Sequence, residues 1–143
     1  IWHAHGDKFD KSNFGEQVLT TGGGCTVGTR AMWLMMQFGY YNQHLFGFDT
    51  CVQSAEKHHA YEFNNSEIEK LGELAEIQLN PSDDPSGRKF LVAGYMLGQL
   101  FDFKKTLGLF ADRLQITVHG DGLLAHWMNV AKIKAEKELN NGD

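Results

Sequence analysis

Three consecutive glycines, Gly22, Gly23 and Gly24, open the stretch with the strongest chemical signal, and Thr26 and Arg30 follow them closely. Glycine lets backbone N–H groups approach an anion, and the N-terminus of a following helix adds a partial positive charge. Thr26 is suited to cap that helix, and Arg30, about one turn into it, is placed to reach a phosphate with two donors. The stretch is neither a Walker A loop nor a Gly-x-Gly-x-x-Gly motif in its usual register. We predict a phosphate-binding turn; the alternatives are a tight turn without a ligand and, for Arg30, a surface salt bridge.

Cys25 lies inside this turn and is one of only two cysteines, the other being Cys51. The electrostatics of a helix N-terminus lower the pKa of a thiol, so we expect a lowered pKa for Cys25. The sequence shows no partner base for it, and we do not predict a nucleophile. Two cysteines cannot form the dense disulfide framework of a small secreted domain, which favours reduced thiols in a cytoplasmic protein.

The tripeptide His-Gly-Asp occurs twice, at residues 5–7 and 119–121, each time at the end of a predicted strand. Ligands bind at the carboxyl ends of the strands in an open parallel sheet, so both copies could face one crevice; chance repetition is the alternative. This position makes His5 and Asp121 candidate nucleotide contacts, although Asp121 would also serve as a cap of the last helix. Asp7 and Asp49, each at a predicted strand end, are candidate ligands of Mg²⁺ or of a ribose; capping or turn roles are the alternatives.

Histidines supply the candidate proton-transfer groups. His58 and His59 lie in a polar, irregular segment, residues 50–71. A loop of this length in a compact domain often has a role in binding or catalysis. His119 follows the last predicted strand. We predict that one or more of these three side chains acts as a general acid or base or contacts a phosphate, with a solvated surface as the alternative.

The elements that must position these residues begin with a strand end at residues 1–4, a loop and a second strand at residues 17–21. The glycine turn leads into a helix from residue 27 to about residue 38, which Gly39 ends. A strand at residues 44–48 would complete a βαβ unit with parallel, right-handed connected strands.

The second half of the sequence predicts a hairpin, a helix, a strand and a last helix, in this order. The hairpin strands are predicted at residues 74–79 and 89–92 around a turn with both prolines, and a helix follows at about 93–110. A strand at 114–119 and a helix at about 123–139 end the pattern. The predicted fold is α/β: one Rossmann-like domain over residues 1–143, with an open, mostly parallel sheet, flanking helices and a small β-hairpin insertion. The apparent strand end at Ile1 suggests the C-terminal portion of a longer protein.

Composition limits the partners. The net charge of −5 argues against a general affinity for nucleic acid, because that partner needs a positive field. No apolar run approaches the roughly 20 residues that cross a bilayer. We expect a cytoplasmic protein with small-molecule partners, and the sequence leaves a homo-oligomer open.

Taken together, several segments resemble the MptE-like family, which is named after archaeal 6-hydroxymethylpterin diphosphokinases and looks related to motility-associated glycosyltransferases that modify flagellins. The segments are His3-Ala4-His5-Gly6-Asp7, the stretch from Thr20 to Arg30, Leu45-Phe46-Gly47-Phe48-Asp49, His58-His59-Ala60-Tyr61 and Val118-His119-Gly120-Asp121-Gly122. They span nearly the whole chain.

The resemblance implies a Rossmann-like fold and nucleotide-dependent transfer. In one branch, diphosphate moves from ATP to a hydroxymethyl acceptor with Mg²⁺, for which Asp7 and Asp49 are the predicted ligands. In the other branch, a sugar moves from a nucleotide donor of the CMP-nonulosonate or UDP-sugar kind, and His58, His59 or His119 would transfer the proton. A nucleotide-binding module without catalytic activity is the third interpretation.

Overall fold

The structure is a computed structural model that describes residues 2–3, 19–20, 22–54 and 73–140. Its first two strands, β1 (Trp2–His3) and β2 (Leu19–Thr20), pair in parallel, with Trp2 opposite Leu19 and His3 opposite Thr20. Both lie inside the predicted strand ranges, so those predictions are confirmed where the chain is described.

Helix α2 (Val27–Gln37) starts where the sequence predicts it, because Thr26 caps it. The Thr29 amide donates to Thr26 Oγ1 at 3.3 Å, and the Thr26 amide donates to Thr29 Oγ1 at 3.3 Å, which together satisfy two amides at the helix start. The helix buries one side, through Thr29, Met32 and Met36. It ends as predicted at Gly39, whose φ of +87° is readily adopted only by glycine.

Strand β3 (Asn42–Phe46) begins and ends two residues before the predicted range. The earlier end has a local cause, since Gly47 has a φ of +71° and leaves the extended conformation. Within the strand, Gln43 and Leu45 are buried and their neighbours are exposed. The buried Gln43 side chain is satisfied by donating to the carbonyls of Met32 and Tyr40.

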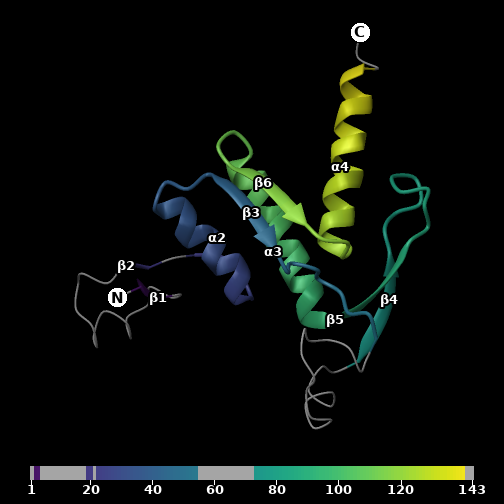
Figure 1. The fold of residues 1–143 in the computed structure, drawn as a ribbon, viewed down its shortest axis with the longest axis horizontal. Coiled ribbons are helices and arrows are strands. Elements are labelled where there is room, and N and C mark those ends of the chain that lie inside the picture. Colours follow the sequence, from purple (N-terminus) through teal and green to yellow (C-terminus); the bar gives the residue numbers. More distant parts are fainter. Residues whose placement is uncertain (1, 4–18, 21, 55–72, 141–143) are drawn as a thin grey trace. The chain divides into compact units, whose positions relative to one another are not determined.

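Strand β3 pairs with β6 (Gln115–His119), and the two strands run in the same direction (Figure 1). The Gln115 amide donates to the Tyr41 carbonyl at the start of the pair, and the rings of Phe46 and His119 stack at its end. The carboxyl ends of both strands therefore lie at the same edge.

The described strands form three two-stranded sheets, β1 with β2, β3 with β6, and β4 with β5. Strand β2 pairs with β1 and strand β3 pairs with β6, so the βαβ unit expected around α2 stays a prediction. What the structure shows is an α/β chain with parallel and antiparallel pairs. The Rossmann-like open sheet stays a prediction.

The hairpin prediction is confirmed. Strands β4 (Leu74–Gln78) and β5 (Lys89–Ala93) are antiparallel, with Leu74 opposite Ala93 and Gln78 opposite Lys89. Val52 adds a single antiparallel bridge to Leu91. The predicted helices and last strand are present too, as α3 (Gly94–Phe110), β6 and α4 (Leu123–Asn140).

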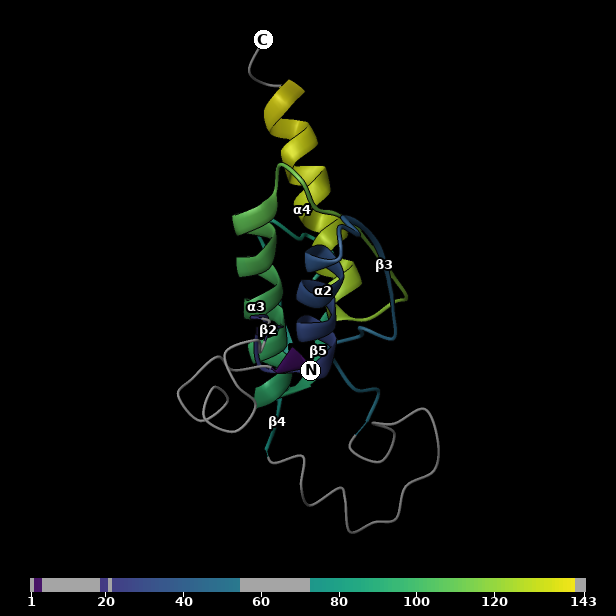
Figure 2. The ribbon, with the colours of Figure 1, turned by 90° about the vertical axis from the view of Figure 1, so that its left-hand side faces the viewer.

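By its contacts, the chain divides into two compact units. The first unit comprises Ile1–His44 and Gly98–Thr117, and the second comprises Leu45–Leu97 and Val118–Asp143, so the boundary passes through β3, α3 and β6. In the first unit, α2 and α3 lie side by side (Figure 2). The rings of Trp33 and Phe110 are nearly perpendicular, and their centroids lie 5.1 Å apart. Among the described helices, none is long and apolar enough to cross a membrane. The single domain remains a prediction.

The core of the first unit can be tested at neighbouring positions of α3. Phe103 is fully buried, whereas Phe101 is 67% exposed. We expect Phe103→Ala to lower the free energy of unfolding by about 3–5 kcal/mol, because it removes apolar contacts and leaves a cavity. Phe101→Ala should change it by about 0.5 kcal/mol or less. Urea denaturation followed by circular dichroism measures both, and equal losses in the two variants would contradict the assignment of the core.

Candidate functional site

The glycine turn of the first unit leads directly into α2. Gly23 and Gly24 have φ values of +126° and +91°, which residues with a Cβ rarely adopt. Thr26 caps the helix at once, and Arg30 lies one turn further on. The predicted phosphate-binding residues Gly22, Gly23, Gly24, Thr26 and Arg30 are thus all placed around the start of one helix.

Packing explains the glycines independently of any ligand. A Cβ on Gly23 would lie 2.8 Å from the Cα of Arg30 and 2.9 Å from the Trp33 ring, and one on Gly22 would lie 3.1 Å from that ring. The turn lies so close to α2 that larger residues would force the backbone to move. Close packing of the turn against its helix is therefore a sufficient reason for glycine at positions 22 and 23.

The turn also contacts an anion of the chain itself. The Cys25 amide donates to Asp102 Oδ2 at 2.6 Å, a short distance typical of a charge-assisted bond. A Cβ on Gly24 would overlap the Asp102 carboxylate, so the side chain lies directly on the turn backbone. Asp102 belongs to α3, and sequence reasoning missed it, because nothing in the sequence near Asp102 signals a partner 77 residues away.

Arg30 is turned back toward the same turn. Its Nε donates to the Gly24 carbonyl at 3.0 Å, so the guanidinium lies next to Gly24. This bond uses one of the five N–H donors of an arginine, and the other four are on the terminal nitrogens.

The pKa of the Cys25 thiol shifts in the direction opposite to the predicted one. The pKa of the thiol is raised above its ordinary value of 9.0, first by desolvation and then by the hydrogen bond and negative charge of Asp102. The nearby Arg30 charge acts in the opposite direction but ranks last among the causes. The predicted lowering of the Cys25 pKa is therefore wrong, because desolvation of the thiol and the nearby Asp102 carboxylate outweigh the effects that lower the pKa.

In the second unit, the carboxyl ends of β3 and β6 bring two predicted residues to one edge. Asp49 follows β3, and the Gly120-Asp121-Gly122 segment follows β6. A Cβ on Gly122 would overlap the Asp49 backbone, and the Leu124 amide donates to the Asp49 carbonyl at 3.4 Å. Only a glycine at position 122 permits this approach, which places Asp49 against the start of α4.

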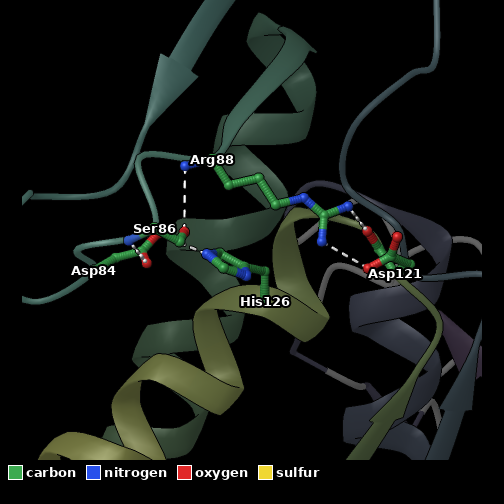
Figure 3. Close-up of polar contacts among 5 residues, drawn as sticks. All are labelled: Asp84, Ser86, Arg88, Asp121 and His126. Atoms are coloured by element: carbon green, nitrogen blue, oxygen red, sulfur yellow. Dashed lines mark hydrogen bonds and ion pairs between the residues drawn. The ribbon is translucent and has the colours of Figure 1, made fainter.

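Asp121 is held by Arg88, which the sequence analysis did not single out (Figure 3). Arg88 Nη1 donates to Asp121 Oδ1 at 2.6 Å, and Nη2 donates to the Asp121 carbonyl at 2.7 Å. The hydrogen bond and the opposite charge lower the pKa of Asp121 and raise that of Arg88. Helix α4 begins at Leu123, two residues after Asp121. The nucleotide contact predicted for Asp121 stays untested, and Arg88 is its partner in this structure.

A second polar pair links the hairpin turn to α4 in Figure 3. His126 Nε2 lies 2.7 Å from Asp84 Oδ2, and the Ser86 amide donates to Asp84 Oδ1 at 3.0 Å. Asp84 is buried. The hydrogen bonds from His126 and Ser86 lower its pKa below the ordinary value of 3.8. We interpret this pair as a structural contact between the two segments.

His119, the one described member of the three predicted proton-transfer histidines, stacks on Phe46 with ring centroids 4.2 Å apart. His5, Asp7, His58 and His59 lie outside the described residues. Of the predicted Mg²⁺ ligands, only Asp49 is therefore described. Within residues 2–3, 19–20, 22–54 and 73–140, no group of three or more His, Cys, Asp or Glu side chains is arranged to hold a metal ion.

Comparisons with protein-family models, curated proteins and solved structures found no match to this chain. The resemblance to the MptE-like family thus rests on the sequence segments alone.

The Asp84 contact gives a prediction for acid stability. Because its pKa is lowered on folding, ionised Asp84 stabilises the fold above about pH 4, and this contribution is lost as the pH falls through the folded pKa. We expect Asp84→Asn to lower the melting temperature at about pH 5, and the difference from wild type to shrink toward about pH 2.5.

The neighbouring variant Asp83→Asn is the matched control. Asp83 pairs with Lys134 at the surface, and an exposed pair of this kind contributes little to stability. Melting curves across the acid range measure both variants. A difference between Asp84→Asn and wild type that does not vary with pH would show that the ionised carboxylate is not what stabilises the fold.

Proposed function

We propose that the chain is the nucleotide-binding part of a transferase and that the phosphates of the nucleotide bind at the turn of Gly22, Gly23 and Gly24. The observation that carries this proposal is the short bond from the Cys25 amide to a carboxylate oxygen. An amide of the turn that donates to one anionic oxygen has the geometry to donate to another. The partial positive charge of the α2 N-terminus adds to the attraction.

Arg30 supplies the second part of the proposed phosphate site. Its Nε bond to the Gly24 carbonyl fixes the guanidinium beside the turn, and the terminal nitrogens are the donors that would grip two phosphate oxygens. Thr26 fixes the start of the helix, because its hydroxyl accepts from the Thr29 amide within the capping box, and its phosphate contact is a prediction from the sequence.

The reaction that the family resemblance favours is diphosphate transfer. A hydroxyl of the acceptor attacks the β-phosphorus of ATP, the bond between the β-phosphorus and the oxygen that bridges to the α-phosphate breaks, and AMP leaves. Catalysis of such a step consists largely of positioning and charge stabilisation, which backbone amides and an arginine supply. The Rossmann-like arrangement of the strands belongs to this proposal, and the parallel pair β1 and β2 is consistent with it.

Mg²⁺ would offset phosphate charge in this reaction. The ion prefers oxygen ligands and is usually bound through one or two carboxylates, with water and substrate completing the shell. Asp49 is a described, exposed carboxylate of this kind. The role of Asp7 as second ligand is a prediction from the sequence.

Sugar transfer is the second candidate, and His119 favours it. Its imidazole lies at the carboxyl edge of β6, stacked on the exposed ring of Phe46. Glycosyl transfer needs a group that protonates the leaving nucleotide or activates the acceptor, and histidine performs such steps near neutral pH. The donor would then be a CMP- or UDP-linked sugar.

A thermal-shift panel of ATP, AMP, CMP, UDP and GDP, each with and without Mg²⁺, tests the proposal. A ligand that binds only the folded chain must raise its melting temperature. Stabilisation by ATP that depends on Mg²⁺ supports the diphosphokinase, and preference for CMP or UDP supports sugar transfer. No stabilisation by any of them would overturn the phosphate site.

Arg30 provides the prediction at residue level. We expect Arg30→Gln to weaken binding of the best nucleotide by about tenfold or more, because a charge-assisted pair with phosphate is lost. Arg113→Gln is the matched control, since Arg113 is an exposed arginine of the same unit beyond the end of α3. Titration calorimetry measures both affinities. If the two variants lose the same amount, net charge rather than the turn determines binding.

A further inference from the structure

The carboxylate of Asp102 occupies the position at the glycine turn where the proposed phosphate has to bind. Its Oδ2 accepts the Cys25 amide at 2.6 Å, and the carboxylate lies against the Gly24 backbone closely enough to exclude a Cβ. The turn therefore satisfies one of its anion-binding amides with a group from its own chain.

Packing between the helices holds Asp102 in this position. Thr106 Oγ1 donates to the Asp102 carbonyl at 2.8 Å, and Trp33 Nε1 of α2 donates to Thr106 Oγ1 at 2.9 Å. One turn earlier on α3, a Cβ on Gly98 would lie 3.1 Å from Cys25 Sγ. Helix α3 thus contacts the turn at Gly98 as well as at Asp102, and the contact is part of the packing of the first unit.

A phosphate and this carboxylate exclude each other for two reasons. The Cys25 amide has one proton and forms one strong, nearly linear hydrogen bond. Two negative groups that compete for the same amide also repel each other. We propose that Asp102 is an internal competitor of the phosphate, so that nucleotide binding has to displace its carboxylate from the turn. This inference rests on the proposed function of the turn and specifies how binding there is regulated.

Asp102→Asn is the variant that tests the competition. The substitution keeps the size of the side chain and the backbone carbonyl that accepts from Thr106, but it removes the negative charge. We expect ATP and inorganic pyrophosphate to bind this variant about tenfold more tightly than wild type, because the neutral amide oxygen of Asn accepts from the Cys25 amide more weakly than a carboxylate does. Asp112→Asn, at an exposed position beyond the end of α3, should bind as wild type does.

Titration calorimetry with the full chain separates the outcomes. Tighter binding by Asp102→Asn alone supports both the competition and the phosphate site. Equal affinity of Asp102→Asn and wild type, or weaker binding by the variant, overturns the competition and leaves the phosphate site standing. No binding of either ligand by any variant overturns both, provided that circular dichroism shows the variants to be folded.

The thiol of Cys25 gives a second readout that needs no ligand. In a Cys51→Ser background, the rate of alkylation by iodoacetamide against pH reports the pKa of Cys25, which burial and the Asp102 carboxylate raise above 9.0. Asp102→Asn should move the midpoint to lower pH, and Asp112→Asn should leave it in place. An unchanged profile in Asp102→Asn would show that the carboxylate does not occupy the turn in solution, and the competition would be overturned.

Discussion

The hydrogen bond from the Cys25 amide to Asp102 joins the turn before α2 to the middle of α3, and it requires the two segments to lie close together. An aspartate has a short side chain, so it reaches the turn only if the two backbones come close. Glycine at positions 24 and 98 permits that approach, because a Cβ at either position would meet the partner segment. The bond from Trp33 to Thr106 links the two helices again, one turn further along α3.

In the second unit, the comparable contacts are ion pairs and hydrogen bonds of charged side chains. The hairpin turn and the first residues of α4 are linked by the Asp84–His126 pair and by the two bonds from Arg88 to Asp121. The Asp121 side chain is 89% exposed, whereas that of Asp84 is 4% exposed. A buried carboxylate that loses its partner is costly, whereas an exposed one is hydrated, so the Asp84 pair fixes the position of the turn.

Local patterns in the sequence predicted the helices, the hairpin and the strand residues that are described, because spacing of apolar residues and the capping signal at Thr26 act within a few residues. The partners of the strands and of the polar side chains could not be predicted in this way. Asp102 and Cys25 are 77 residues apart, and Arg88 and Asp121 are 33 apart. Gly47, before which β3 ends, carries no sequence signal that separates a strand residue from one with a positive φ.

The same separation in sequence explains why a glycine-rich turn is ambiguous evidence for a ligand. Glycines permit close approach to a phosphate, but here they equally permit close approach to Trp33 and to Asp102. The residues of the turn are the same in both cases, and the difference lies in α3. If a phosphate displaces the carboxylate, the free energy of the Cys25 bond is subtracted from the free energy of binding, so that the affinity of the turn depends on how α3 packs. A turn whose amide is already bonded within the chain then binds only ligands that form stronger bonds than Asp102 does.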